Sequence, residues 1–300
     1  MIPEIVLIDA NAIGFARQMG GAVMKAGDME TQAVFGFVDY MRELKVKYPY
    51  AKIIVVWDGR ADWRFCMMPK YKSTRKKNPA MLRQRDAYKE QVPFIKACLT
   101  AMGVDQYVPG DYEADDIAGK YVRRLGAKHK ILLVTSDQDW LQLVGPTVHW
   151  WDFRADQLVT LDTLEDKTGY DCPILFMESK CLTGDGGDDV PGVGGIGKVN
   201  AKKMLDRFGG IRAAITYIRD HPEEKWPKAW VALGTPDRLK RLAENRTMMD
   251  LRTDHSPPGS KNGKYVKGNY SEGEITATFE TLYFNSMLGR LDGWLAPFRR

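Results

Sequence analysis

The sequence predicts an α/β protein with a mostly parallel central sheet flanked by helices. Short apolar, β-branched runs indicate buried strands at 4–10, 52–59 and 130–137, with a further strand at 147–152. Helical periodicity occupies the segments between them, at roughly 30–47, 80–102 and 113–126. Strands that alternate with helices are typical of parallel sheets covered by helices on both faces.

Each of the first three predicted strands ends in an aspartate. These residues are Asp9, Asp58 and Asp137. The carboxyl ends of neighbouring parallel strands meet at one edge of a sheet, and the functional crevice of such sheets lies beyond that edge. We therefore expect the three carboxylates to lie close together in a candidate active site.

The strand signal fades after about residue 160. We therefore divide the chain into an α/β core at 1–160 and a helical region at 161–300. Within the helical region, 255–274 is rich in Pro, Gly, Ser and Lys, which predicts a surface loop. Helical periodicity returns between Ile275 and Leu291.

The bulk composition is that of an ordinary globular protein. The 300 residues are 44% hydrophobic and carry a net charge of +5, without an apolar run of membrane-spanning length or a leader-like N-terminus. We therefore expect a soluble, cytoplasmic monomer. The four cysteines lack C-x-x-C spacing and the four histidines are scattered singly, so we expect reduced thiols and no histidine-based zinc site.

Further carboxylates cluster in three short segments. YEADD supplies Glu113, Asp115 and Asp116; SDQD adds Asp139 to Asp137; and LTGDGGDD supplies Asp185 and Asp188. Glu113 and Asp116 share a face of a regular helix, whereas Asp115 points elsewhere unless the first turn is distorted. Asp137 and Asp139 share a face if the strand continues that far. Taken singly, each group also fits a cap or a favourable helix-dipole contact.

Together these carboxylates predict a metal site. They all fall at strand ends or loops that face the same predicted edge, where mutual repulsion would raise their pKa values unless cations compensate them. Oxygen-only ligands suit Mg²⁺ or Mn²⁺. Two such ions a few ångströms apart are the usual arrangement for phosphodiester hydrolysis.

Positive charge is concentrated in one stretch. Residues 60–90 contain ten Lys and Arg but only three acidic residues. A basic stretch alone is usually a solvated face. Beside clustered carboxylates, it instead suggests a polyanion held against bound cations.

The segment GVGGIGKV, at 192–199, partly matches a phosphate-binding loop of ATPases. That motif requires a hydroxyl residue after the lysine and a buried strand before the loop. Here Val199 follows Lys198, and the preceding LTGDGGDDVP is acidic and glycine-rich. We therefore reject an ATP site and look for another role for these glycines.

The motifs VLIDAN, VVWDGR, YKSTR, YEADD, TSDQDWLQL and LTGDGGDDVPGVGGIGKVNA occur in the order of the 5′-nuclease, or flap endonuclease, family. The chain resembles the bacterial and phage branch, which includes the 5′-nuclease domain of DNA polymerase I. The motifs run from residue 7 to about 205, and no polymerase domain follows, as in free-standing phage-type enzymes. The resemblance implies a PIN-like nuclease fold with a helical arch at about 60–100.

The resemblance also implies roles for the acidic residues. Those around the first metal position are Asp9, Asp58, Glu113, Asp115 and Asp116. Those associated with the second are Asp137, Asp139, Asp185 and Asp188. In two places the chain departs from the family pattern without losing a ligand, because Ala10 and Asp189 stand where glycine and asparagine are frequent.

Basic residues match two DNA-binding features of the family. Tyr71 and Lys72 correspond to the aromatic–lysine pair at the foot of the family's helical arch, and Arg75 follows at the familiar spacing; the resemblance implies catalytic roles for these three residues. Lys70, Lys76 and Lys77 beside them are expected to bind DNA. GGIGKVNA resembles the glycine turn of a helix–two-turn–helix, at about 182–220, whose amides and lysines hold duplex phosphates. The residues implied there are Gly195, Gly197, Lys198, Lys202 and Lys203, and K⁺ is expected at the turn carbonyls.

The resemblance implies a Mg²⁺-dependent 5′-3′ exonuclease and flap endonuclease, with Mn²⁺ as a substitute, active in replication, primer removal or repair. Its expected partners are 5′ flaps, nicked or gapped duplex DNA and RNA–DNA hybrids. Two alternatives remain: a PIN-like ribonuclease, and a DNA-junction binding protein without metals. The arch and the glycine turn argue against the first, and the intact acidic residues argue against the second.

Overall fold

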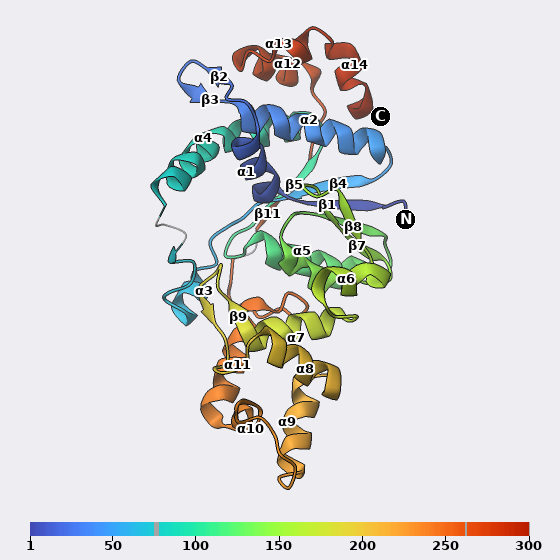
Figure 1. Cartoon of the computed structure of the whole chain (residues 1–300). Helices are drawn as coiled ribbons and strands as arrows, with labels where there is room; N and C mark the ends of the chain where they lie inside the picture. The colour runs from blue at the N-terminus through green and yellow to red at the C-terminus, as the bar shows by residue number, and fades with distance from the viewer. Residues whose placement is uncertain (75–77, 262, 300) are drawn as a thin grey trace.

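The computed structural model describes residues 1–74, 78–261 and 263–299. Its centre is a seven-stranded sheet of order β11-β5-β4-β1-β6-β7-β8 (Figure 1). The strands, in chain order, are β1 (Ile5–Asp9), β4 (Lys52–Val56), β5 (Asp105–Val108), β6 (Ile131–Val134), β7 (Val148–Asp152), β8 (Gln157–Val159) and β11 (Lys264–Val266). The five central strands are parallel, and β11 and β8 add antiparallel edges. The predicted fold class is confirmed.

Alternation along the strands builds a core on each face of the sheet. Val6 and Ile8 of β1 join one cluster, which contains residues of α1 (Ala10–Gly20), α2 (Gln32–Lys47) and α4 (Pro79–Ala101). Ile5 and Leu7 join the other, against α5 (Ala114–Leu125) and the 3-10 helix η2 (Gln138–Leu143). Figure 1 shows α2 and α5 on opposite sides of the strands. The predicted two-sided cover is confirmed.

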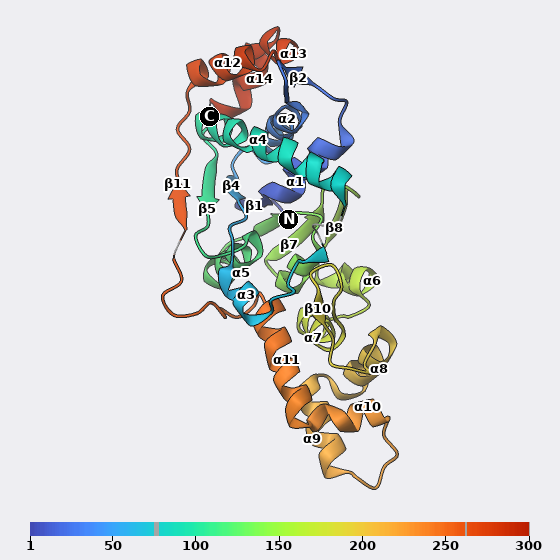
Figure 2. The ribbon, with the colours of Figure 1, turned by 90° about the vertical axis from the view of Figure 1, so that its left-hand side faces the viewer.

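A second lobe extends away from the sheet (Figures 1 and 2). Its helices are α7 (Pro173–Thr183), α8 (Lys198–Phe208), α9 (Ile211–Asp220), α10 (Lys228–Val231) and α11 (Pro236–Met249). A small core containing Ala201, Met204 and Leu205 packs α8 against its neighbours. The short pair β9 (Gly184–Asp185) and β10 (Val190–Pro191) lies between α7 and α8.

The remaining elements are short or peripheral. They are β2 (Lys25–Ala26), β3 (Met29–Glu30), α3 (Asp62–Met67), α6 (Leu164–Thr168), α12 (Glu272–Thr281), α13 (Asn285–Leu288) and α14 (Leu291–Leu295), with the 3-10 helices Leu161–Thr163, Ala232–Gly234 and Ala296–Phe298. Among the described residues, no helix combines the length and apolar character needed to cross a membrane.

The C-terminal segment differs from the expected helical region. Strand β11 lies within the predicted loop at 255–274 and pairs antiparallel with β5, while α12 to α14 pack on the α2 and α4 face of the core. Phe279 and Trp294 are fully buried there. A chain that leaves the core after about residue 160 therefore returns to it, because the apolar face of its last helices completes one side of the sheet.

Candidate active site

Asp9 and Asp58 lie at the carboxyl edge of the sheet, as expected. Asp9 is the last residue of β1, and its carboxylate accepts hydrogen bonds from the Ala12 amide at 2.9 Å and the Thr135 hydroxyl at 2.8 Å. Asp58 lies two residues beyond β4 and accepts from the Ala114 amide at 2.9 Å and from Asn11 at 2.7 Å. Both carboxylates are thus held in place by the elements that follow neighbouring strands.

These carboxylates line one cavity of about 560 Å³. Five acidic residues contribute to it: Asp9, Asp58, Asp115, Asp137 and Asp188. Burial and the charge of Asp58 raise the pKa of Asp9 to about 7. Burial, followed by the charges of Asp137 and Asp58, raises the pKa of Asp115 well above its usual range. The cavity therefore collects negative charge that it does not neutralise well by itself.

The acidic residues at the start of α5 point in two directions. Asp115 lines the cavity and accepts a hydrogen bond from the buried Trp140 indole at 2.7 Å. Asp116 instead turns back to the Glu113 amide at 2.9 Å. Glu113 and Asp116 thus share one side of the turn, where both accept from Arg64, and Asp115 points elsewhere, as expected. It is Asp115 that lines the larger cavity.

Arg64 binds the two acidic side chains of this turn that point away from the larger cavity, Glu113 and Asp116. The sequence analysis did not single it out. Its guanidinium is buried and donates to both oxygens of Asp116, at 2.7 and 2.6 Å. It also donates to Glu113 at 3.4 Å and to the carbonyl of Met248 at 3.3 Å. An arginine on an apolar helix two turns before the YKSTR motif is the sequence signal that could have indicated it.

Tyr71 and Lys72 connect the predicted arch base to the carboxylates. The Tyr71 hydroxyl donates to Glu113 at 2.8 Å and to Asp188 at 3.2 Å. Lys72 Nζ lies 2.7 Å from Glu113 Oε1 and 3.8 Å from Asp188 Oδ2. Lys70 is exposed nearby, whereas Arg75, Lys76 and Lys77 lie outside the described residues. The structure thus brings the aromatic–lysine pair directly against both acidic groups.

Asp137 and Asp139 do not share a strand face. Strand β6 ends at Val134, and Asp137 caps η2 by accepting from the Asp139 amide at 2.8 Å. Asp137 lines the larger cavity, while Asp139 faces a smaller hollow that also touches Asp185 and Asp188. The expectation of a continued strand is wrong because the chain enters a 3-10 helix immediately after Asp137.

Lys180 is a further site residue that the sequence analysis missed. Its ammonium forms ion pairs with Asp139 and, at 3.0 Å, with Asp185. Burial tends to raise the pKa of Asp185, but Lys180 and two backbone amides together lower it. A lysine on α7 five residues before an aspartate of the glycine-rich turn is a signal visible in the sequence.

The carboxylate oxygens of the site are suitable ligands for a divalent cation. The carboxylates around the two hollows offer only oxygen ligands, and three of them, Asp9, Asp58 and Asp115, carry raised pKa values that a cation would relieve. As the side chains stand, no three acidic, histidine or cysteine side chains within the described ranges close around one point. Lys72, Lys180 and Arg64 hold several of the carboxylates instead.

The glycine turn leads into α8. Gly194 and Gly195 have φ values of 41° and 75°, a region that favours glycine, and Gly197 is the N-cap of α8. Two-residue β10 precedes the turn and lies outside the main sheet, which removes the context of an ATPase loop. Lys198 and Lys203 are exposed, while Lys202 pairs with Asp206 on the same helix at 2.6 Å.

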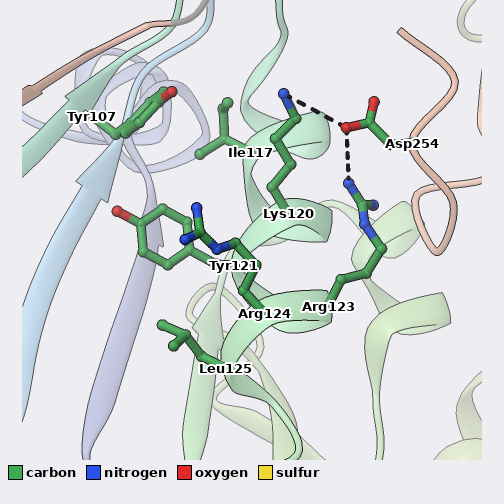
Figure 3. Close-up of a pocket in the computed structure, with 8 residues that line it drawn as sticks. All are labelled: Tyr107, Ile117, Lys120, Tyr121, Arg123, Arg124, Leu125 and Asp254. Carbon is green, nitrogen blue, oxygen red and sulfur yellow. Dashed lines mark ion pairs between the residues drawn. The ribbon is translucent and has the colours of Figure 1, made fainter.

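A separate cavity of about 640 Å³ lies farther along α5 (Figure 3). Lys120 and Arg123 share Asp254 there, at 3.7 and 3.6 Å, and Arg124 stands beside Tyr121. None of the residues that line this cavity belongs to the two acidic hollows. It therefore stands apart from the candidate active site.

Comparison with known proteins identifies the family. The model described as the 5′-3′ exonuclease, N-terminal resolvase-like domain, matches residues 4–169. The chain is 31% identical to DNA polymerase I of Lactococcus lactis subsp. lactis (strain IL1403), over 69% of this chain and 24% of that protein. It thus spans about a quarter of that relative. It is also 31% identical to a 5′-3′ exonuclease of Streptomyces coelicolor, over 80% of each chain.

Solved structures agree on the fold. The T5 5′-exonuclease with bound zinc ions superposes with a TM-score of 0.70 and 20% identity, over 98% of this chain and 97% of that one. At such identity the likeness concerns the fold alone. The family match covers more than half of the chain and includes Asp9, Asp58, Asp115 and Asp137 of the larger acidic cavity, while Asp188 lies beyond it. The chain therefore belongs to the 5′-3′ exonuclease family defined by the N-terminal resolvase-like domain.

Proposed function

We propose that the chain is a Mg²⁺-dependent, structure-selective 5′ nuclease that hydrolyses DNA phosphodiesters as a 5′-3′ exonuclease and flap endonuclease. The observation that carries this proposal is the direct contact between the arch base and the acidic cavity, through Lys72 and Glu113 at 2.7 Å. A phosphate that enters beside Lys72 would reach the carboxylates of both hollows. Relatives include a 5′-3′ exonuclease, and one solved neighbour is a phage T5 flap endonuclease in a product complex with DNA and metal ions.

We assign the divalent ions to the carboxylate groups that line the two hollows. The first group comprises Asp9, Asp58, Glu113 and Asp115; the second comprises Asp137, Asp139, Asp185 and Asp188. Because both oxygens of Asp116 accept from Arg64, we propose that Asp116 orients Glu113 and Arg64 and acts on the metals indirectly. When bound, Mg²⁺ or Mn²⁺ lowers the pKa of a water and neutralises charge on the scissile phosphate.

The remaining chemistry belongs to side chains of this chain. Lys72 presents an ammonium beside the carboxylates, where it would stabilise charge that develops on the scissile phosphate. Tyr71 donates to Glu113 and Asp188 and so holds one carboxylate of each group in position. We propose that Lys70, Arg75, Lys76 and Lys77 contact the 5′ strand as it approaches this point.

The glycine turn and α8 would hold the duplex arm. The exposed Lys198 and Lys203 are free to contact phosphate, whereas the Asp206 carboxylate competes for Lys202. Backbone amides at Gly195 and Gly197 can add hydrogen bonds to the same phosphates, and K⁺ can bind the turn carbonyls. Such contacts read the backbone and not the bases, as expected for an enzyme selective for structure.

An experiment with four labelled substrates tests the proposal. A 5′-flap duplex, a nicked duplex, an RNA–DNA hybrid and a single-stranded RNA are incubated with the protein in Mg²⁺ and in EDTA. We expect Mg²⁺-dependent cleavage near the flap junction and little cleavage of unstructured RNA. Preferred cleavage of single-stranded RNA would favour the PIN-like ribonuclease, and junction binding without cleavage would favour a DNA-binding protein without metals.

A further inference from the structure

Arg154 brings a third element to the larger acidic cavity. It lies in the turn of the β7–β8 hairpin and lines the same cavity as Asp9, Asp58 and Lys72. Figures 1 and 2 place this hairpin well apart from α3, the helix that leads to Lys72. Among the described residues, Lys72 and Arg154 therefore bring positive charge to the cavity from different parts of the fold.

The two cations differ in how their charge is used. Lys72 is bound by Glu113 and Asp188, and two further cations in the part of the site that the structure describes, Arg64 and Lys180, are bound by carboxylates as well. Arg154 is exposed, and within the described residues its guanidinium contacts only the Phe153 ring, with its central carbon 5.9 Å from the ring centroid. Its positive charge is thus available to a ligand.

The carboxylates of the hairpin itself are engaged elsewhere. Asp152 accepts from the Arg154 backbone amide at 3.0 Å and lies 3.8 Å from Lys167 Nζ. Asp156 accepts from the Trp151 indole at 3.1 Å. These contacts shape the turn without neutralising the arginine, so the guanidinium stays at the rim of a cavity lined by five aspartates.

The hairpin holds the base of Arg154 firmly. Trp150, Trp151 and Asp152 pair with the three residues of β8, and Lys47 Nζ lies 3.7 Å from the centroid of the Trp151 ring. The Phe153 ring packs at 6.0 Å from that of Tyr40. A guanidinium on a fixed turn loses less conformational freedom when it binds a ligand than one on a mobile loop would.

We propose that Arg154 binds a phosphodiester adjacent to the scissile one, on the side of the cavity away from Lys72. This inference rests on the proposed nuclease function and adds a substrate contact to it. A guanidinium fits a phosphate through two parallel hydrogen bonds, which an ammonium cannot form. Substrate phosphates would arrive at this rim once cations neutralise the aspartates, so Arg154 would fix the register of the strand.

The test combines protein variants with modified DNA. Each 5′-flap substrate of a series carries one neutral methylphosphonate, and its position differs from substrate to substrate so that the series covers the phosphates around the cleavage site. Binding is measured in Ca²⁺, and single-turnover cleavage in Mg²⁺, for the wild type, Arg154→Ala and Arg154→Lys. We expect Arg154→Ala to bind unmodified DNA about tenfold more weakly, and Arg154→Lys to recover only part of the loss.

The modified substrates locate the contact. At one methylphosphonate position the wild type should bind more weakly than it binds unmodified DNA. Arg154→Ala should bind that substrate about as well as it binds unmodified DNA, because this variant already lacks the contact between Arg154 and the phosphate. Arg124→Ala is the matched control, since Arg124 is also an exposed arginine but lies in the separate cavity of Figure 3. Its binding should differ less from that of the wild type.

The results distinguish a failure of the Arg154 inference from a failure of the proposed nuclease function. If the wild type cleaves but Arg154→Ala and Arg124→Ala lose the same affinity at every methylphosphonate position, Arg154 makes no phosphate contact and the inference is wrong. An equal loss at all positions would also overturn it, because that result indicates a general electrostatic effect. If the wild type itself shows no Mg²⁺-dependent cleavage, the proposed function fails before the inference is tested.

Discussion

The buried Arg64 on α3 and Asp116 on α5 form a bidentate ion pair, with N–O distances of 2.7 and 2.6 Å. The pair joins the segment that leads to Lys72 to the helix that carries Glu113 and Asp115. The same guanidinium reaches the Met248 carbonyl at the end of α11. One side chain therefore couples the segment before Lys72, the acidic turn and the second lobe.

Replacing Arg64 should destabilise the fold. Arg64→Met leaves the buried Glu113 and the half-buried Asp116 beside an apolar group, and loss of one partner of a buried pair typically costs about 3–5 kcal/mol. Urea denaturation of the variant checks this value. Arg60→Met is the control, because Arg60 pairs with Asp62 on the surface, where its side chain is 76% exposed. Equal stability of the two variants would show that the buried pair contributes little.

Lys180 should compete with the metals. Its ammonium holds Asp139 and Asp185, so Lys180→Met should lower the melting temperature in EDTA by leaving two carboxylates close together. Added Mg²⁺ should then raise the melting temperature of the variant more than that of the wild type. A smaller metal-induced rise in the variant would indicate that Lys180 does not occupy a metal position.

The raised pKa of Asp9 predicts a pH dependence. Its value of about 7 in the folded state exceeds the ordinary 3.8, so the folded state binds more protons between these values. In EDTA, the contribution of Asp9 to stability therefore falls as pH rises from 4 to 7. Relative to the wild type, Asp9→Asn should gain stability between about pH 5 and pH 8.

Mg²⁺ should reverse this order at the upper end of the range. The cation stabilises the ionised carboxylate, so the wild type gains melting temperature with Mg²⁺ while Asp9→Asn gains less. Thermal unfolding in EDTA and in Mg²⁺ at both pH values measures the two effects. A wild type and variant that respond alike to pH and to Mg²⁺ would remove Asp9 from the metal site.

The two lysine groups should affect different steps. Lys198→Ala with Lys203→Ala should weaken duplex binding and lower the slope of log affinity against log salt by roughly one unit per lost contact. Lys72→Ala should mainly slow single-turnover cleavage of bound DNA, on the order of a hundredfold. If Lys72→Ala loses only affinity and cleaves bound substrate at the wild-type rate, its catalytic role is wrong.

Local patterns in the sequence were sufficient to predict the centre of the fold. The apolar runs that end near Asp9, Asp58 and Asp137 become the strands β1, β4 and β6, in which β1 lies between the other two. Their alternating residues enter the two cores on opposite faces of the sheet. Strand β11 could not be predicted in the same way. Its three residues, Lys264 to Val266, are polar at the first position and gain their strand geometry from pairing with β5.

The site was predictable in composition more than in geometry. The acidic residues could be named because they lie in short motifs, but the partners that distinguish Asp115 from Asp116, the Trp140 indole and the Arg64 guanidinium, come from distant segments. Lys180 and Arg64 lie near acidic or arch motifs in the sequence, but their carboxylate partners, like the place of Arg154 at the cavity, are fixed only when distant segments meet. Arg64, for example, is 52 residues from the carboxylate that it holds.

Single-turnover cleavage by Asp188→Asn tests the central claim most directly. Asp188 borders both acidic hollows, and its substitution removes one negative charge. With a labelled 5′-flap substrate in Mg²⁺, we predict nearly complete loss of cleavage while flap binding stays equal or becomes tighter. Asp292→Asn, whose carboxylate pairs with Arg299 near the C-terminus, is the matched control and should cleave normally. Cleavage by Asp188→Asn at the wild-type rate would contradict the assignment of the acidic hollows as the metal-dependent nuclease site.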